Sequence, residues 1–285
     1  MSIEYSSQLL GKDRQVYYRS IHRKKKDLEI SEQVVALIQN ERIKLPNSGH
    51  RMLYSLLYPQ LKSLGVGRDK LLQIMKANHL EIQAKRAYHV TTDSDHRFKT
   101  YPDLVDGLEI NRPEQVVVAD ITYVGTRDNP WYLALVTDAY SKKIMGYDLS
   151  RSLDKEGVIR ALKMAIKQRE YKGETLIHHS DRGVQYCSKA YQKLLRKSKI
   201  ITSMTETYDP YKNAIAERIN RTIKHDFNLS KYVSYEIVFE AYLKECIKTY
   251  NFIRPHMSCY MRTPIQMHKT RGKKRRTYRT VKVTQ

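Results

Sequence analysis

The spacing of apolar residues changes from helical to strand-like part-way along the chain. Apolar residues recur every three or four positions in the first third, and those within residues 30–38 mark one face of an amphipathic helix. Residues 116–150 instead contain runs of β-branched and aromatic residues. The change predicts a boundary in the loop around Asn111–Pro113, with a helical region over residues 1–110 and an α/β domain over residues 111–270.

A pair of helices is predicted near the middle of the helical region. Residues 49–64 predict one helix that stops at Gly65, and residues 68–80 predict a second. Two helices joined by a tight glycine turn are typical of a helix-turn-helix, here over about residues 45–80, whose second helix can lie in a DNA groove. An ordinary helical hairpin with a solvated charged face is the alternative. The candidate DNA-binding residues of this pair are Arg51, Arg68 and Lys70.

The second part of the chain has a distinctive order of elements. Three consecutive strand candidates with short turns predict an antiparallel meander. The complete order βββαβαβα implies a mixed sheet whose faces are covered by helices. The predicted elements are strands over residues 116–124, 131–140 and 142–150, a helix over 154–170, a strand over 175–181, a helix over 190–199, a strand over 200–204, a long helix from about Asn213 and a last helix over 233–250.

Three acidic residues lie at informative positions in this order. Asp120 is in the middle of the first, very apolar strand, Asp181 ends the fourth strand, and Glu217 is about one turn into the long helix. If the fourth strand pairs beside the first, both aspartates reach one end of the sheet. Crowded carboxylates repel each other unless hard cations such as Mg²⁺ lie among them. Singly, each acid could equally be a capping or salt-bridged surface carboxylate.

Two Mg²⁺ ions held in this way could activate an attacking oxygen and stabilise a leaving one during displacement at phosphorus. The nucleophile would then be water or a DNA 3′ hydroxyl, and the protein would need no serine, cysteine or histidine for covalent attack.

Composition narrows the choice of partner. The chain has 285 residues with 52 Lys and Arg against 30 Asp and Glu, and a net charge of +22 indicates a polyanionic partner, DNA first of all. A ribosome-associated or merely basic protein has the same composition. The three cysteines form no Cys-x-x-Cys pair, which is typical of a reducing cytoplasm. The sequence shows neither a signal peptide nor a membrane span, and we expect no membrane partner.

Five ordered blocks carry a resemblance to a known family. They resemble successive parts of the integrase core of insertion-sequence transposases and, more narrowly, of the second-frame product, OrfB, of the IS-three family. Asp181 and Glu217 are separated by 35 residues, the hallmark interval of that family. The segments GKDRQVYYR and SGHRMLYSLL resemble its N-terminal region, so the likeness covers nearly the whole chain. The five blocks are DITYV, TDAYSKKIMGY, HHSDRGVQYCS, YKNAIAERINRTIK and YNFIRPHMSCYMRTPIQMH.

The resemblance implies a ribonuclease-H-like, retroviral-integrase-like DDE core. Asp120, Asp181 and Glu217 would be the catalytic ligands of two Mg²⁺ ions, with Mn²⁺ as a substitute. The implied reaction cleaves one strand at an element's end, after which the new 3′ hydroxyl attacks the other end, and the joined circle is later inserted into target DNA. Cys187 replaces the usual Ser or Thr. His178 and His179 are interpreted as packing groups or as groups that support the metal ligands without binding the ion, because Mg²⁺ prefers oxygen ligands.

The long helix is expected to contact DNA. Lys224 matches the family's basic residue seven positions after Glu217, and Asn213 and Arg221 share its helical face. Lys212 departs from a position that is often acidic in relatives and could add a phosphate contact. A solvated helix face is the alternative for Arg221 and Lys224.

The resemblance also implies partners. Products of this kind commonly act when fused by frameshifting to the first-frame product, OrfA, which recognises the terminal repeats, and we expect a homo-oligomer on DNA in the nucleoid. The short helix-turn-helix predicts weak sequence discrimination by the chain alone. The basic tail over residues 271–285 is a further candidate for binding a polyanion. Two other functions stay open: a regulator that binds element ends without catalysis, and a nuclease that only hydrolyses DNA.

Overall fold

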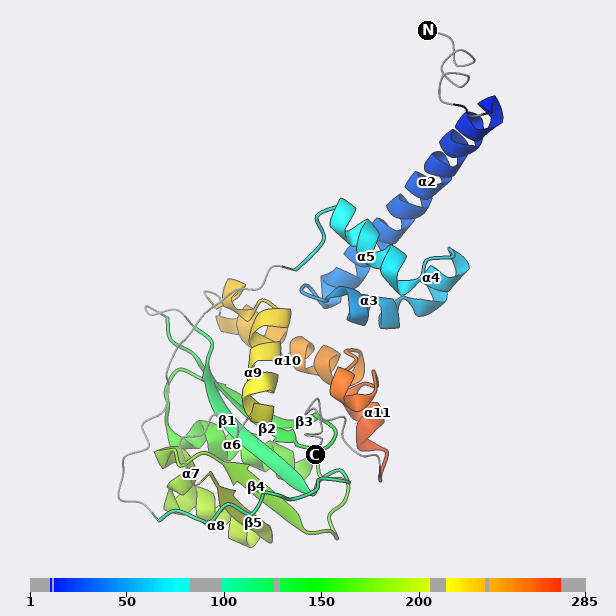
Figure 1. Ribbon diagram of the computed structural model, residues 1–285. Coiled ribbons are helices and arrows are strands. Elements are labelled where there is room, and N and C mark those ends of the chain that lie inside the picture. Colours follow the sequence, from blue (N-terminus) through cyan, green and yellow to red (C-terminus); the bar gives the residue numbers. More distant parts are fainter. Residues whose placement is uncertain are drawn as a thin grey trace, which may run out of the picture. The chain divides into compact units, whose positions relative to one another are not determined.

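The structure, a computed structural model, divides into two compact units (Figure 1). One consists of residues 1–44 and 48–84, and the other of residues 45–47 and 85–285. In the part of the chain that the structure describes, no helix combines the length and the apolar character needed to cross a membrane. The described residues are residue 11 and residues 13–82, 99–125, 129–205, 214–233 and 236–272.

The first unit is a small helical domain. The long helix α2 (Arg14–Lys44) packs with its C-terminal half against α3 (His50–Leu56), α4 (Tyr58–Ser63) and α5 (Arg68–Ala77). Gly65, with φ +66°, lies in the turn between α4 and α5, so the predicted helix, glycine turn and helix are present. The fully buried residues of this core are Val34, Ile38, Leu53, Leu61 and Leu71.

One predicted helix of this unit was wrong in its extent. Residues 49–64 form two helices, α3 and α4, which meet at Leu57. Pro59 lies in the first turn of α4, where a proline without an N–H is tolerated, whereas it would interrupt the hydrogen bonds of one continuous helix.

The second unit is built on a five-stranded mixed sheet with the order β3-β2-β1-β4-β5. β1 pairs antiparallel with β2, and β2 with β3, which confirms the meander. β4 pairs parallel with β1 and with β5, as expected for the fourth strand. The α/β fold class and the order βββαβαβα are therefore confirmed. The strands are β1 (Val116–Tyr123), β2 (Tyr132–Asp138), β3 (Ile144–Ser150), β4 (Leu176–Ser180) and β5 (Ile200–Met204).

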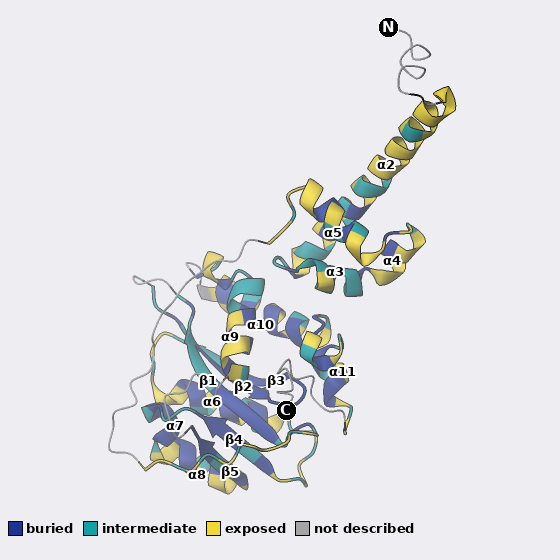
Figure 2. Cartoon of the chain, viewed as in Figure 1, coloured by how far each residue is buried: buried dark blue, intermediate teal, exposed yellow. Residues whose placement is uncertain are grey.

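Helices cover both faces of this sheet. Helices α6 (Lys155–Lys167), α7 (Val184–Cys187) and α8 (Lys189–Lys197) pack on the face formed by Val117 and Ala119. Helix α9 (Ala214–Asp226) packs on the other face, where Val116 and Val118 contact Ala216. Alternate residues of a strand point to opposite faces, so the first half of β1 is buried on both sides by these helices, whereas its second half has intermediate exposure (Figure 2).

The last helices complete the second unit. α10 (Glu236–Phe252) follows the short 3₁₀ helix η2 (Leu229–Lys231), and α11 (Pro264–His268) follows η3 (Met257–Cys259). Arg254, just after α10, donates from Nε and Nη2 to Asp226 Oδ2 at 3.1 and 2.6 Å. His256 Nε2 lies 2.9 Å from Arg254 Nη1. These contacts hold the C-terminal turn against the core.

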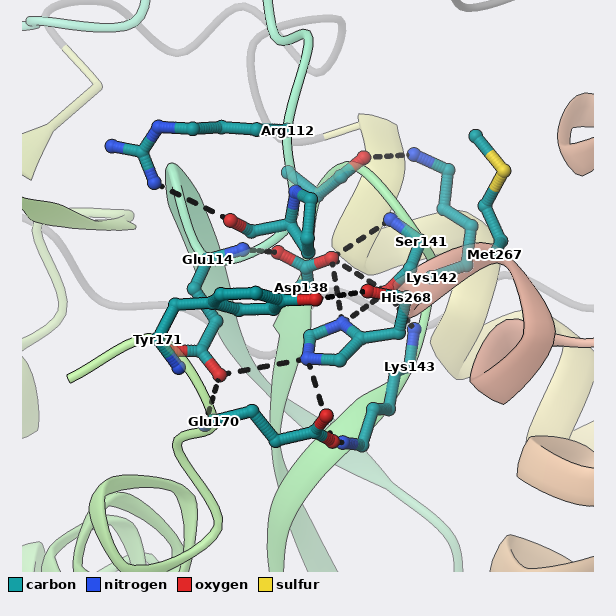
Figure 3. A network of polar contacts seen from close by, with 12 residues as sticks. Arg112, Glu114, Asp138, Ser141, Lys142, Lys143, Glu170, Tyr171, Met267 and His268 are labelled. Carbon is teal, nitrogen blue, oxygen red and sulfur yellow. Dashed lines mark hydrogen bonds and ion pairs between the residues drawn. The ribbon is translucent and has the colours of Figure 1, made fainter. Parts of the chain in front are cut away.

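A buried polar network joins α11 to the start of β1 and the end of β2 (Figure 3). Asp138 Oδ1 accepts from the Glu114 N–H at 2.8 Å, and Asp138 Oδ2 accepts from Ser141 Oγ at 2.5 Å. His268 Nδ1 lies 2.9 Å from Ser141 Oγ and 3.4 Å from Asp138 Oδ2. All four residues are fully buried. Side chains far apart in the sequence are thus tied together where water cannot replace their contacts.

The charges of this network compensate one another. Burial raises the pKa of Glu114, but hydrogen bonds from His268, the Glu170 N–H and Arg169 outweigh it and bring the pKa to about 2. Burial lowers the pKa of His268, yet its hydrogen bonds with Asp138 and Glu114 raise the pKa above the ordinary histidine value. The imidazole of His268 therefore lies between the carboxyl groups of Glu114 and Asp138, and such partners are the condition for keeping charged groups inside a protein.

We expect His268→Leu to lower the free energy of unfolding by about 3–5 kcal/mol, because two buried carboxylates lose their cation. The contribution of His268 is complete at pH values below the ordinary histidine pKa and is lost as the pH rises through its raised pKa. Glu114 contributes above the ordinary glutamate pKa and loses its contribution as the pH falls towards 2. The difference from wild type should be largest near about pH 5.

Urea denaturation between pH 3 and pH 9 measures this difference. Lys244→Gln, on an exposed position of α10, is the control and should leave the unfolding curve nearly unchanged. A His268→Leu variant as stable as the control at every pH would contradict the charge-compensated network.

Candidate active site

The carboxylate of Asp120 lies on β1, the central strand of the sheet. The strand pairs with β2 on one side, where Leu135 is opposite Asp120, and with β4 on the other. Asp120 Oδ1 accepts from the Ile121 N–H at 2.9 Å, and Oδ2 accepts from Asn220 Nδ2 on α9 at 2.7 Å. Both donors are neutral. They hold the carboxylate in place without cancelling its charge.

The parallel pairing of β1 with β4 brings Asp181 level with Asp120. Val118 is the partner of His179 in this register, and each aspartate follows two residues later in the same direction. Glu217 lies in the first turn of α9 and is exposed. Asp120 and Asp181 are 61 positions apart and are brought together by one strand pairing. Glu217, 36 positions further on, lies on a helix that packs on the sheet.

Electrostatics shows that the three carboxylates act on one another. The pKa of Asp120 is raised to about 8 by burial first, then by the negative charge of Asp181, with a further contribution from Glu217. The hydrogen bonds from Ile121 and Asn220 lower it only in part. Burial also raises the pKa of Glu217. A carboxyl group whose pKa is raised in this way is one whose anion lacks a compensating cation.

The carboxylates fit a hard cation by their chemistry. Oxygen ligands of this kind are those that Mg²⁺ prefers, and a cation would relieve the repulsion that raises the pKa of Asp120. Over the residues that the structure describes, no three His, Cys, Asp or Glu side chains form a ready group that could hold a metal ion.

A small pocket adjoins the two aspartates. It lies at the ends of β1 and β4 and is partly aromatic, so the carboxylates border a recess whose walls are less polar than water. The residues that line it are Asp120, Ile121, Tyr123, Tyr132, Leu153, Asp181, Gln185 and Tyr186.

The histidines and the cysteine beside Asp181 are buried in the core. His178 Nε2 lies 2.8 Å from Tyr191 Oη, and His179 Nδ1 lies 2.9 Å from Ser203 Oγ. Burial lowers the pKa of His178 to about 3, so it is neutral, and neither histidine lines the pocket. Burial raises the pKa of Cys187 to about 11, so its thiol stays protonated and is a poor nucleophile. Both histidines are therefore buried beside the site and do not face the pocket.

Sequence reasoning missed Asn220. It lies three residues after Glu217, so it could have been found by asking which α9 residues face β1 rather than which share the face of Arg221. Asn220 is 4% exposed, whereas Arg221 is exposed. Lys224 is partly buried, and its Nζ donates to Thr122 Oγ1 at 3.4 Å. Lys224 therefore lies against β1 beside Asp120 and not on the outer face of the helix.

The other predicted DNA contacts have varied surroundings. Lys212 and Asn213 lie outside the described residues. Arg51 is exposed on α3. On α5, Arg68 lies 3.4 Å from Asp69, and Lys70 Nζ donates to Asp27 of α2 at 2.9 Å. These ion pairs are exposed and therefore weak, so a phosphate group could displace them.

Comparison with known proteins places this site in context. The family description "Integrase core domain" matches residues 110–210, and a second description of the same wording matches residues 198–264. Asp120 and Asp181 lie in the first matched segment and Glu217 in the second.

Several proteins resemble the chain over different lengths. It is 35% identical over 231 residues to the "Insertion element IS600 uncharacterized 31 kDa protein" of Shigella sonnei, which covers 79% of this chain and 82% of that protein. It is 40% identical over 113 residues to the "Transposase for insertion sequence element IS629" of Shigella sonnei, covering 40% and 38%. It is 28% identical to the "Transposase InsF for insertion sequence IS3A" of Escherichia coli K12, covering 67% of each.

A solved structure shares the fold. The integrase chain in the cryo-EM structure of a simian T-cell lymphotropic virus intasome in complex with a PP2A regulatory subunit matches with a TM-score of 0.50 at 18% identity, covering 82% of this chain and 79% of that one. At this identity the match shows the ribonuclease-H-like, integrase-type architecture alone.

We expect Asp120→Asn to stabilise the metal-free chain at neutral and alkaline pH. The raised pKa means that ionisation of Asp120 costs free energy in the folded state, so wild type loses stability as the pH rises from about 4 towards about 8. The variant lacks this ionisation and keeps its stability over that range.

Thermal unfolding with a chelator at pH 4, 6 and 8 tests this expectation. The advantage of Asp120→Asn should be absent at pH 4 and grow with pH, whereas Asp148→Asn, which removes the carboxylate that pairs with Arg160, should show no such gain. Parallel pH profiles for wild type and Asp120→Asn would mean that the carboxylate is not destabilised by its neighbours.

Proposed function

This chain belongs to the insertion-sequence transposases of the IS-three family, which have an integrase-like catalytic core, and we propose that Asp120, Asp181 and Glu217 are its catalytic residues. It is thus a DDE-type polynucleotidyl transferase, and transposases with this core act on DNA, use divalent metal ions and work as oligomers. The finer assignment is DNA strand cleavage and strand transfer at the ends of an insertion sequence, with two Mg²⁺ ions as cofactors and Mn²⁺ as a substitute.

The observation that carries the assignment is the pairing of β1 with β4, which brings Asp120 level with Asp181 beside one pocket, and the raised pKa of Asp120 agrees with it. A structural carboxylate inside a protein is normally stabilised by donors or cations until its pKa falls, whereas burial first, and then the charges of Asp181 and Glu217, raise the pKa of this one. Such an arrangement lowers stability unless a cation is bound. This favours a metal-dependent catalytic site over a purely structural role or a regulator that only binds DNA.

The proposed role of each catalytic residue follows from its position in the fold. Asp120 and Asp181, on adjacent strands, provide the rigid part of the ligand set, and Glu217 on α9 completes it. When bound, Mg²⁺ supplies Lewis-acid activation of the attacking oxygen and neutralises charge on the leaving oxygen. The attacking group is water in cleavage and a DNA 3′ hydroxyl in joining. The protonated thiol of Cys187 and the buried histidines take no part.

The DNA-binding surface is proposed on both parts of the chain. On α9, Lys224 lies beside Asp120 and Arg221 is exposed, and both are suited to contact the strand being cut. On the helical region 1–110, the helix-turn-helix provides further phosphate contacts. The proposed DNA-binding residues are Arg51, Arg68, Lys70, Lys212, Asn213, Arg221 and Lys224.

Partners are proposed from the family. The polypeptide is expected to act as a homo-oligomer on element ends and target DNA, and to be joined or associated with the OrfA product. The core is proposed to extend over residues 111–270, with residues 271–285 as a basic tail and the nucleoid as the place of action. The exposed, ion-paired basic residues of α5 support contacts with phosphate more than with bases.

A strand-joining assay separates the possible functions. Labelled duplexes carrying the element's ends are incubated with the full-length protein and Mg²⁺. Joined products support a transposase, nicks without joining indicate a nuclease, and binding without either indicates a regulator. The last two outcomes would each overturn the proposal.

In the same assay we expect Glu217→Gln to reduce cleavage and joining by at least about a thousand-fold, a loss of about 4 kcal/mol in transition-state stabilisation. DNA binding should stay within about two-fold of wild type, because only a metal ligand is removed. Glu245→Gln, an exposed acid on α10, is the matched control and should keep wild-type activity. Cleavage by Glu217→Gln at the wild-type rate would remove Glu217 from the site.

DNA binding should weaken steeply with salt, because Lys and Arg displace counterions from the phosphates. Arg221→Ala should reduce the slope of log K against log salt by about one, and Lys244→Ala on α10 should leave it unchanged. Fluorescence anisotropy between about 50 and 200 mM salt measures both slopes. A flat response of the wild type would contradict the polyanion-binding surface, and equal slopes for wild type and Arg221→Ala would exclude that contact.

A further inference from the structure

Asn220 is the one α9 side chain that donates a hydrogen bond to Asp120 among the contacts that the structure describes. Its Nδ2 lies 2.7 Å from Asp120 Oδ2, and the residue is 4% exposed. The amide oxygen, Oδ1, is buried and has no hydrogen-bond partner in the described residues. An asparagine buried with half of its amide unpaired costs free energy. A purely structural asparagine would be expected to have both halves satisfied.

We propose that Asn220 is a positioning residue, which holds the Asp120 carboxylate by one oxygen and sets the place of α9, and with it Glu217, along β1. This inference rests on the proposed function, because it gives Asn220 a purpose only if Asp120 binds a cation.

The contacts between α9 and β1 follow both the repeat of the strand and the repeat of the helix. Asp120 and Thr122 are two apart, so both point to the same face of the sheet. Asn220 and Lys224 are four apart, so both point to the same face of the helix. Asn220 binds Asp120, and Lys224 binds Thr122 at 3.4 Å. Two successive contacts of this kind define the register of the helix along the strand.

Register along β1 determines where Glu217 lies. Glu217 precedes Asn220 by three residues and so lies almost one turn earlier on the same side of α9. A shift of the helix by one turn would move it by about 5 Å, too far for Glu217 to share an ion with Asp120. Asn220 therefore links the positions of two proposed ligands, Asp120 and Glu217, although it is not itself a ligand.

The chemistry of an amide suits this position better than a charged donor. A lysine or arginine donating to Asp120 would neutralise its charge and compete with a metal cation. The neutral amide orients the carboxylate through one hydrogen bond to Oδ2 and brings no positive charge that would compete with a metal ion. The orientation of the amide is also defined, since its oxygen facing a carboxylate would be repulsive. Oδ1 is then left to accept from a water or hydroxyl group that enters the site.

The test compares Asn220→Leu with Asn251→Leu in the full-length protein. Asn251 is a matched control because it is also buried and hydrogen-bonded, with its amide accepting from the Ile144 N–H and donating to the Ile144 carbonyl, both at 3.0 Å. Two quantities are measured: binding of Mn²⁺ alone by calorimetry, and the Mg²⁺ concentration that gives half-maximal DNA cleavage. Thermal unfolding is followed for both variants.

For Asn220→Leu we expect Mn²⁺ binding to weaken by about 10–100-fold and the Mg²⁺ requirement to rise by a similar factor. The cleavage rate at saturating Mg²⁺ should change much less, because the ligands themselves are intact. Asn251→Leu should lower the unfolding temperature while leaving Mn²⁺ binding unchanged.

Unchanged Mn²⁺ binding by a folded Asn220→Leu variant would overturn the inference. If this variant does not fold, Asn220→Ala, which removes the amide without adding a larger group, takes its place with the same expectations. Asp120→Asn separates the two levels of the argument: if it keeps cleavage activity, the proposed function fails, whereas if it abolishes cleavage and Asn220→Leu changes nothing, only the role of Asn220 fails.

Discussion

The burial of a carboxylate in the central strand of the sheet is the constraint on which the site depends. β1 is paired with β2 and β4, its first half is covered on both faces, and Asp120 lies half-buried at the edge of a small pocket. Asp181 and Glu217 make its ionisation still less favourable. The neutral donors Ile121 and Asn220 orient the carboxylate but leave its charge uncompensated. The uncompensated charge destabilises the metal-free chain, and a bound cation removes this destabilisation. The instability of the site therefore contributes to its affinity for metal.

The surroundings of two acids on or beside β1 shift their pKa values in opposite directions. Glu114, just before β1, receives hydrogen bonds from Arg169 and backbone N–H groups and lies 3.5 Å from His268, and its pKa falls to about 2. Asp120, further along, has a pKa raised to about 8. The first pattern holds the fold together, since each charge has its counterpart within the protein. The second leaves a charge to be balanced by something from outside. This difference separates a structural acid from a catalytic candidate more clearly than burial does.

The sequence predicted the sheet well because its signals are local or follow general rules of topology. Alternation and turn residues marked the strands, and the parallel pairing of the fourth strand with the first brought Asp120 level with Asp181. The break at Pro59 was missed because the helical period continues across it. The contact of Asn220 with Asp120 depends on how a helix is rotated on a sheet, and that of His268 with Glu114 joins opposite ends of the domain. No periodicity within one segment encodes either contact.

The net positive charge of the chain is opposite in sign to the charge of the acidic residues in its proposed active site. A protein with a net charge of +22 attracts DNA over long distances, yet the three acids repel phosphate at the point where chemistry must occur. A divalent cation removes this conflict, because it neutralises the carboxylates and attracts the phosphate. Metal and DNA should therefore strengthen each other's binding by the same factor, as linkage requires. The basic surface alone would gather DNA without cutting it. Because the acid cluster repels phosphate, the bound DNA strand can approach Asp120 only when a metal ion is present.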